Sequence, residues 1–432
     1  MMRHPCQLIV PTALAIVIGA CQPAPEPETP SGPPKVRLEV GDPVTVPTDQ
    51  YPGLSYGPRM VTLPDGTVLV GRGQVALTTS DSGATWDVGP AIARPHLLPL
   101  RDGSYFFLKS RGSATGEPGL FSLEMAHVQS LDENATEERI SWSPATARVD
   151  RWTPLTADNE TEVDYLGVGG PFLELDDGTL LAACYGNFKG DTVPMEGFPA
   201  TGGQKWFKYR TYLLASSEGG ATWEYLSTIA YDGVTGQESF CEPAMVDLGG
   251  GELLAVMRTG RFAPMFQARS LDGGKTWQDP ESMHILGLAP QMVLLENGAL
   301  VCSFGWRRLK VGYGHGLNDE GGPYPAALRD YRERYLQDVD IENPSEAAGD
   351  YVMVSLDKGK TWSEPRKFAE PLTSGYTLLA ATGPDTVLVM SARLTLPGQS
   401  RERHLEIWER EWPQWSDKSV VVRVARKIRV VL

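Results

Sequence analysis

One pattern recurs six times along the chain and constrains the fold more than any other feature. Each copy has a small residue or proline, an apolar stretch, a turn at Asp-Gly or its equivalent, and a second apolar stretch. The copies begin at Pro58, Pro95, Gly170, Pro243, Pro290 and Tyr376. Asp-Gly and Asn-Gly supply the positive φ angles of a tight hairpin, so each copy predicts two short antiparallel strands. Repeated hairpins indicate one array, although 432 residues would otherwise suggest roughly two or three domains.

Several of the expected strands are apolar on both faces, which is typical of the inner strands in the blades of a β-propeller. We therefore predict an all-β fold, a six-bladed β-propeller that occupies residues 36–432 and ends in a basic C-terminal tail. One of the chain ends must close such a ring. Either residues 36–46 or the tail, residues 419–432, could supply the outer strand of the last blade, and the pattern does not decide between them.

A second motif, Ser/Thr-x-Asp-x-Gly-x-Thr-Trp, follows some of the hairpins. It occupies residues 79–86, 216–223, 270–277 and 355–362, with Glu218 in place of the aspartate in the second copy. A short aspartate turn with glycine forms hydrogen bonds within itself, and its tryptophan packs inward. We therefore assign these aspartates a structural role and no catalytic role.

Residues 1–20 have the pattern of an export signal. A short basic start precedes an apolar run that is too short to span a bilayer, and small residues lead directly to Cys21. This order resembles the bacterial lipobox, which implies a lipid on Cys21; ordinary signal cleavage with an incidental thiol is the alternative. Residues 21–35 hold the lipidated cysteine and a Pro-rich tether. We expect an extracytoplasmic protein, lipid-anchored to a bacterial membrane and facing the periplasm or the cell surface.

Charge and cysteine spacing exclude several partners. The formal net charge of −15 argues against non-specific binding of nucleic acid. Cys184, Cys241 and Cys302 show neither CxxC spacing nor histidine partners, so we interpret them as buried free thiols rather than metal ligands. No metal and no cofactor is predicted, although carboxylates in loops could still hold Ca²⁺. No protein partner is evident in the sequence.

The repeat also predicts which residues share a face. The second strand of each hairpin returns to the face that the first strand leaves, so residues before first strands and past second strands meet there. The positions before first strands are Gly57, Arg94, Gly169, Glu242, Ala289 and Tyr376, and those past second strands are Arg72, Arg111, Tyr185, Arg258, Arg307 and Arg393. Such a gathering of arginines suits an anionic ligand. The alternative is that single arginines are solvated or paired with acidic residues.

Several of these segments resemble the sialidase superfamily, whose Asp boxes match the second motif. The stretch EPAMVDLGGGELLAVMR holds Glu242 and Arg258 at the family's spacing. The stretch SGYTLLA places Tyr376 at the position of the family's nucleophile. The stretch FGWRR places Arg307 near one of the three arginines with which the family binds the substrate carboxylate. The resemblance implies a sialidase-type propeller in which Glu242 is the base of Tyr376. It also implies that Arg258 and Arg307 bind the substrate carboxylate.

The chemistry of sialic acid explains why such a family uses a tyrosine. The sugar carries a carboxylate on its anomeric carbon, which would repel a carboxylate nucleophile but not a neutral phenol. A glutamate beside the tyrosine can take its proton, so that the pair acts as one nucleophile. The resemblance therefore implies an exo-acting, retaining glycoside hydrolase that removes a terminal acidic sugar from an acidic glycan.

Blade 1 departs from the family in two places. Where the family has its first triad arginine, this chain has Gly57, and Arg59, Arg72 or Arg94 could take its place in space. The family's acid, an aspartate in a loop before the first Asp box, is absent because GRGQVALTTSD leaves almost no loop there. We expect Asp164 or another acid from an insertion to donate the proton instead.

Three insertions are expected over the face that carries the site. They are residues 126–164, 188–209 and 310–349, and the last contains a short amphipathic helix at residues 326–339 that could form a lid. Solvated charges on surface loops are the alternative.

Two other functions remain open. The chain could be a non-catalytic glycan-binding surface lipoprotein, which the missing acid favours. It could also be a propeller hydrolase or lyase that acts on uronate-containing polysaccharide. A propeller scaffold for protein partners has no support beyond the fold itself.

Overall fold

The computed structural model describes residues 36–47, 59–72, 75–89, 96–109, 111–131, 139–149, 165–168, 170–195, 207–260, 263–306, 349–369, 373–395, 400 and 420–432. All of them belong to one compact unit, Pro33–Leu432. Every regular element among them is a β-strand. None of the described residues forms a helix long and apolar enough to cross a membrane. The predicted signal, Cys21 and its tether, and the predicted helix at 326–339 lie outside the described residues.

The six predicted hairpins are all present as antiparallel strand pairs. They are β3 (Arg59–Thr62) with β4 (Val68–Arg72), β7 (His96–Pro99) with β8 (Tyr105–Leu108), β13 (Phe172–Glu174) with β14 (Leu180–Gly186), β17 (Cys241–Asp247) with β18 (Leu253–Arg258), β21 (Leu288–Leu294) with β22 (Leu300–Trp306), and β25 (Thr373–Gly383) with β26 (Thr386–Thr395). In the first five hairpins the turn uses glycine in the left-handed region, for example Gly66 with φ +85° and Gly298 with φ +85°. The local turn chemistry therefore forms the strands that the sequence predicts.

Further strands complete the sheets. They are β5 (Val75–Thr79) and β6 (Asp87–Gly89), β9 (Arg111–Ala114), β10 (Leu120–Val128), β11 (Ser143–Arg148) and β12 (Tyr165–Gly167), β15 (Arg210–Ser216) and β16 (Thr222–Ala230), β19 (Pro264–Ser270) and β20 (Glu281–Leu286), and β23 (Gly349–Ser355) and β24 (Arg366–Ala369). Strand β11 pairs in parallel with β16, which joins the second and third repeats into one ten-stranded sheet. The expectation that residues 126–164 form an insertion over the site face is wrong in part, because residues 143–148 are the outer strand β11, paired with β10.

Both chain ends close the last sheet, where the sequence left a choice between them. Strand β27 (Val420–Val431) pairs with β26, and β1 (Arg37–Val40) and β2 (Val44–Val46) pair with β27. The C-terminal strand is therefore the third strand of the sheet, and the N-terminal residues form its outer edge. A closure that uses both ends ties the start of the described chain to its end.

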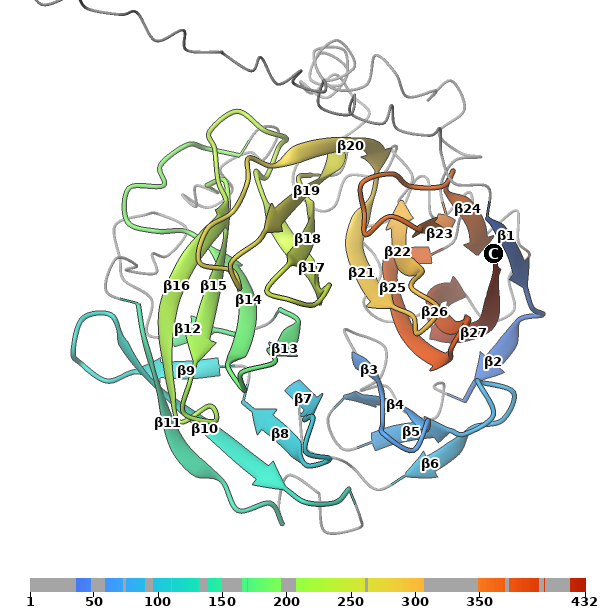
Figure 1. Cartoon of the computed structure of the whole chain (residues 1–432), viewed down its shortest axis with the longest axis horizontal. Coiled ribbons are helices and arrows are strands. Elements are labelled where there is room, and N and C mark those ends of the chain that lie inside the picture. The colour runs from blue at the N-terminus through green and yellow to red at the C-terminus, as the bar shows by residue number, and fades with distance from the viewer. Residues whose placement is uncertain are drawn as a thin grey trace, which may run out of the picture. The chain divides into compact units, whose positions relative to one another are not determined.

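The first strands of the hairpins line the centre of the unit (Figure 1). Contacts run from β17 to β21, from β21 to β25, from β25 to β3, from β3 to β7 and from β7 to β13, and β17 also contacts β14. The apolar core lies between neighbouring sheets: one cluster packs Val301 and Val352 against Val387 and Ile428. This arrangement is that of an all-β propeller, in which apolar sheet faces pack against each other around a centre.

The Asp boxes lie between the third and fourth strands of their sheets. In the first box, Asp81 accepts hydrogen bonds from the Thr85 hydroxyl (2.6 Å), the Thr85 amide (2.9 Å) and the Thr79 hydroxyl (2.8 Å). These bonds lower the pKa of Asp81 to about 2, and equivalent bonds, first from Thr276, lower the pKa of Asp272 to about 2. The indole of Trp223 is buried, with 1 % of its surface exposed. The structural role assigned to the boxes is consistent with this bonding.

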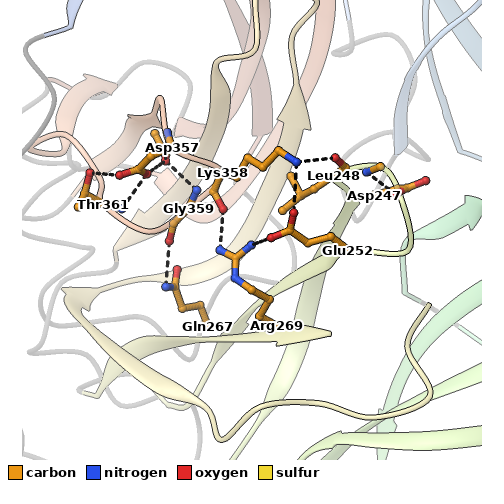
Figure 2. Close-up of polar contacts among 11 residues, drawn as sticks. Asp247, Leu248, Glu252, Gln267, Arg269, Asp357, Lys358, Gly359 and Thr361 are labelled. Carbon is orange, nitrogen blue, oxygen red and sulfur yellow. Dashed lines mark hydrogen bonds and ion pairs between the residues drawn. The ribbon is translucent and has the colours of Figure 1, made fainter. Parts of the chain in front are cut away.

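Figure 2 shows how one Asp box holds two sheets together. The Lys358 ammonium donates to the carbonyl oxygen of Leu248 and to Glu252, each at 3.2 Å. Arg269 donates to the backbone carbonyl of Lys358 at 2.6 Å. The box between β23 and β24 is thereby bonded to the neighbouring sheet that contains β17 to β20.

Because neighbouring strands are antiparallel, the strand ends lie on two opposite faces of the sheets. The turns after the first strands and the Asp boxes lie on one face, where a hydrogen bond of 2.9 Å from the Gly273 amide to the Gly251 carbonyl joins a turn to a box. We call this the turn face. The residues at which the first strands begin lie on the opposite face, which we call the strand-start face.

Candidate active site

Two first strands begin with a β-bulge on the strand-start face. The register of β17 shifts between Cys241 and Ala244, and that of β21 shifts between Leu288 and Gln291. Glu242 and Ala289 occupy equivalent places in these bulges, and both have φ +46°. A bulge bends its strand and turns a side chain in a new direction. Because Ala289 has the same φ in an equivalent bulge, we attribute the bend to the repeat pattern. Of these two bulges, the one in β17 presents a carboxylate, that of Glu242.

Tyr376 lies in a wider irregularity at the start of β25. The register shifts between Thr373 and Thr377, and Gly375 has φ +75°. Strand β22 passes close to this segment: a Cβ atom on Gly305 would lie 2.3 Å from the Gly375 carbonyl oxygen. Glycine at 305 is therefore required for the close approach that positions Tyr376.

The structure brings Tyr376 and Glu242 into direct contact. The phenol oxygen of Tyr376 donates to Oε1 of Glu242 at 2.8 Å. The two residues come from different sheets and are 134 positions apart in the chain. The Tyr376 side chain remains 37 % exposed, so a ligand can reach it. The pair that the sequence predicts is thus assembled on an accessible surface.

Arg258 ends β18 directly behind this pair. Its Nη1 donates to Oε2 of Glu242 at 3.0 Å, and its Nη2 donates to Oε1 of Glu238 at 2.7 Å. Only 7 % of the residue is exposed. Burial works against its charge, but the carboxylates of Glu238 and Glu242 outweigh it and hold the pKa of Arg258 well above the ordinary value. Its Nε has no hydrogen-bond partner among the described residues.

Glu238 is a member of the site that sequence reasoning missed. It is 5 % exposed and its Oε2 accepts a hydrogen bond of 3.4 Å from the Cys241 thiol. Its backbone amide donates to the Thr259 carbonyl at 3.0 Å, and its carbonyl accepts from the Tyr209 amide at 2.7 Å. The sequence contains one signal for it: a second glutamate four residues before Glu242.

Two more tyrosines surround Glu242. Tyr185 lies near the end of β14, at the place that corresponds to Arg258, and its ring meets Tyr209 edge-on with centroids 5.3 Å apart. Burial, and after it the charge of Glu242, raises the pKa of Tyr185 far above its usual value, while burial also raises that of Tyr209. Both phenols therefore stay protonated at neutral pH. Among the large apolar side chains that the described residues expose, the two aromatic ones are Tyr185 and Tyr376.

The other predicted site residues are not brought together by the described part of the chain. Arg307 and Arg94 lie outside it, as does Asp164. Arg59 and Arg72 begin and end described strands, but their side chains lie outside the description. Their role in binding a substrate stays a prediction, as does that of Arg258.

Several expected absences can be compared with the described residues. Only residues 73–74 separate β4 from β5, so the short connection expected in place of the family's acid loop is confirmed. Cys184, Cys241 and Cys302 are buried free thiols, as predicted. Burial, and after it the carboxylate of Glu238, raises the pKa of the Cys241 thiol well above its usual value. The described residues contain no group of three or more histidines, cysteines, aspartates or glutamates that could hold a metal ion.

Comparison with known proteins supports the sequence resemblance. Residues 105–301 match the family model of the BNR repeat-like domain. This match confirms the predicted resemblance to sialidase-like proteins with BNR repeats. No curated protein matches the chain.

Solved structures resemble the chain at low sequence identity. A protein of unknown function from Dyadobacter fermentans is 15 % identical, with 91 % of this chain and 99 % of that chain covered and a TM-score of 0.54. A Hadza microbial sialidase is 15 % identical over 77 % of this chain and 62 % of its own, with a TM-score of 0.47. An α-L-arabinanase from Penicillium chrysogenum, complexed with arabinobiose, is 12 % identical over 90 % and 98 %, with a TM-score of 0.47. At such identities the likeness concerns the fold alone.

Proposed function

We propose that the chain is an exo-acting glycoside hydrolase of sialidase type that removes a terminal acidic sugar, sialic acid or a similar one. The match of residues 105–301 to the family model of the BNR repeat-like domain supports this proposal. The observation that carries the proposal is the hydrogen bond of 2.8 Å between the Tyr376 phenol and Glu242. A half-exposed phenol bonded to a carboxylate is an activated, uncharged nucleophile. The fold supports the proposal, and we count its hairpins as six blades.

In the proposed reaction, the Tyr376 oxygen attacks the anomeric carbon while Glu242 accepts the phenol proton. The bond to the leaving oxygen breaks as a proton donor protonates it, and a glycosyl–tyrosine intermediate forms. Water then attacks the anomeric carbon and gives a proton back to the deprotonated donor. The tyrosine oxygen leaves and takes back the proton from Glu242, and the sugar keeps its configuration. Because Tyr185 and Tyr209 hold their protons tightly, they suit hydrogen-bond donation better than proton transfer. We assign the proton donor to an insertion, with Asp164 as the first candidate.

The substrate carboxylate is proposed to lie on the Arg258 side of the tyrosine. Arg258 uses two of its N–H groups for Glu242 and Glu238, and its charge is close to Tyr376. Arg307 is the proposed second contact. Arg94, Arg72 and Arg59 are candidates for the place of the family's remaining arginine.

Hydrolysis of a fluorogenic sialoside and of uronate-bearing glycosides tests this function. The parent protein is compared with Tyr376→Phe, and Tyr225→Phe serves as a matched control because Tyr225 bonds to Thr228 on the outer strand β16. We expect Tyr376→Phe to lose activity by at least about a hundredfold and the control to keep it. Equal activity in all proteins would remove Tyr376 from the mechanism. An ultraviolet-absorbing unsaturated product from uronate polysaccharide would instead indicate a lyase.

A second candidate function is non-catalytic glycan binding. The short connection between β4 and β5 favours it, because it has no room for the acid that the resemblance leads one to expect. Glycan-array binding that is lost in Arg258→Met, with no hydrolysis of the bound glycan, would support this function over the enzyme.

The anchor on Cys21 is also a proposal. Arg37 pairs with Val431, and the adjacent Val430 amide donates to the carbonyl of Asp385 in the β25–β26 turn. The described chain therefore starts at the turn face, opposite the face that carries the candidate site. Mass spectrometry of the mature protein tests the lipid, and Cys21→Ser should release the protein from membranes.

A further inference from the structure

Three charges are buried together behind Tyr376, and they do not balance. One cation, Arg258, bonds to two anions, Glu238 and Glu242, at 2.7 and 3.0 Å. The exposed fractions of the three side chains are 8 %, 6 % and 18 %. Charges removed from water interact strongly with each other, because little solvent screens them. The positive charge of Arg258 is thus shared between the two glutamates.

We propose that Glu238 is a positioning residue that acts through Arg258 on both halves of the site. By taking part of the charge of Arg258, it keeps Glu242 basic enough to accept the Tyr376 proton, and it limits the attraction of Arg258 for an anionic sugar. This inference rests on the proposed function and deepens it. It makes Glu238 a determinant of the balance between turnover and substrate affinity.

The loop before β17 fixes Glu238 in this place. Gly236 has φ +54°, and a Cβ atom there would lie 2.1 Å from the Thr259 carbonyl oxygen. The buried Lys208 ammonium donates to the Gly236 carbonyl at 2.8 Å, and Ser239 has φ +55°. Together with the two backbone bonds of Glu238, these contacts hold its backbone in place, and the bonds of its carboxylate to Arg258 and Cys241 hold the side chain.

The neighbouring titratable groups leave this charge balance unchanged near neutral pH. Tyr185, Tyr209 and Cys241 face the cluster from β14, the segment before β15 and β17, and their pKa values are all raised, first by burial. They are therefore uncharged, and Tyr376 adds a neutral phenol. The charged group bonded to Glu242 in this geometry is Arg258, which also bonds to Glu238, and the buried Lys208 ammonium donates to the carbonyl of Gly236, two residues before Glu238.

The test compares Glu238→Gln with the parent in steady-state hydrolysis of the fluorogenic sialoside. The glutamine keeps a hydrogen-bond acceptor for Arg258 and removes the negative charge. Arg258 then stabilises ionised Glu242 more strongly, so we expect kcat to fall about tenfold and the acid limb of the kcat/KM profile to move about one pH unit lower. KM for the anionic substrate should fall several-fold because Arg258 attracts it more.

A matched control is available on the turn face. Glu252 pairs with Arg269 as Glu238 pairs with Arg258, but it lies in the contact shown in Figure 2. Glu252→Gln removes the same charge and should leave kcat, KM and the pH profile unchanged. Glu238→Asp keeps the charge at the site and should restore the parent pH profile, which a merely structural role would not predict. A parent-like profile and KM in Glu238→Gln would overturn the inference.

An activity-free measurement separates this inference from the proposed function. Ultraviolet titration of phenols, taken as the difference between a protein and its Tyr376→Phe variant, reports the ionisation of Tyr376. Loss of the negative charge at 238 should let this phenol ionise at lower pH in Glu238→Gln than in the parent. If the parent hydrolyses none of the glycosides, the proposed function fails, yet this shift still decides whether Glu238 acts on the pair. An unchanged titration would show that it does not.

Discussion

The turn face and the strand-start face come from the same repeat, yet their polar groups differ in what they bond to. Both faces contain left-handed residues other than glycine: Ser82 and Lys358 on the turn face, Glu242 and Ala289 on the other. On the turn face, the carboxylates of Asp81, Asp272 and Asp357 each accept hydrogen bonds from the hydroxyl and the amide of a threonine in the same box. On the strand-start face, the buried carboxylates of Glu238 and Glu242 share Arg258. The Nε of Arg258 has no hydrogen-bond partner among the described residues.

This difference shows how a repeat can separate stability from chemistry. Local bonds within a turn need only the turn's own residues, so they recur wherever the motif recurs. The site uses the beginnings of strands, where bulges let the backbone differ between copies and where side chains from several sheets converge. We therefore expect substitutions on the turn face to affect folding alone, and those on the strand-start face to affect folding and ligand chemistry together.

The largest effect is expected from Arg258→Met. Removal of this cation leaves Glu238 and Glu242 buried without a counter-charge, which costs about 3–5 kcal/mol. Urea unfolding at neutral pH measures this loss. Arg269→Met on the turn face is the matched variant: its partner Glu252 is 22 % exposed, and we expect a loss of about 1 kcal/mol there. Equal losses in the two variants would contradict the distinction between the faces.

A smaller effect is expected from Gly305→Ala. The added methyl group would overlap the Gly375 carbonyl, so β22 and β25 must separate, at a cost of about 1–3 kcal/mol. Because Gly375 precedes Tyr376, the Tyr376–Glu242 contact should lengthen and glycosidase activity should fall more than stability. Gly167→Ala serves as control, since nothing lies within 4 Å of a Cβ atom there. Full activity in Gly305→Ala would show that the close approach does not position the tyrosine.

The same comparison explains which parts of the molecule the sequence predicts. The hairpins and Asp boxes follow from residues adjacent in the chain, such as Asp81 and Thr85, so their motifs are visible without a structure. The Tyr376–Glu242 pair follows because the repeat places both residues before first strands. Glu238 lies in an irregular loop, and the other repeats have no acidic residue at the corresponding place in the sequence, so no periodicity points to it. The parallel pairing of β11 with β16 depends on contacts between distant segments, which no local pattern encodes.

An acid-dependent effect of lesser size is expected from Asp272→Asn on the turn face. The folded-state pKa of Asp272 is about 2, below the usual 3.8, because Thr276 donates to it. Ionised Asp272 therefore stabilises the fold at pH values above 3.8, and this contribution is lost as the pH falls toward 2. Thermal unfolding should show a lower Tm for Asp272→Asn at neutral pH, with the difference shrinking below pH 3.8. Hydrolysis or glycan binding should not change, and a change would mean that the turn face also contributes to the site.

The smallest effect is expected from Ala289→Gly, in the bulge that matches that of Glu242. Glycine would relieve a left-handed alanine, a gain of about 1–2 kcal/mol. Its greater freedom in the unfolded chain costs about 0.5–1 kcal/mol, and loss of a buried methyl group costs about 0.8 kcal/mol. These terms nearly cancel, so urea unfolding should change by less than about 0.5 kcal/mol. A loss well beyond that would mean that the methyl group holds the bulge, and the bend at Glu242 would then depend on its own side-chain contacts rather than on the repeat.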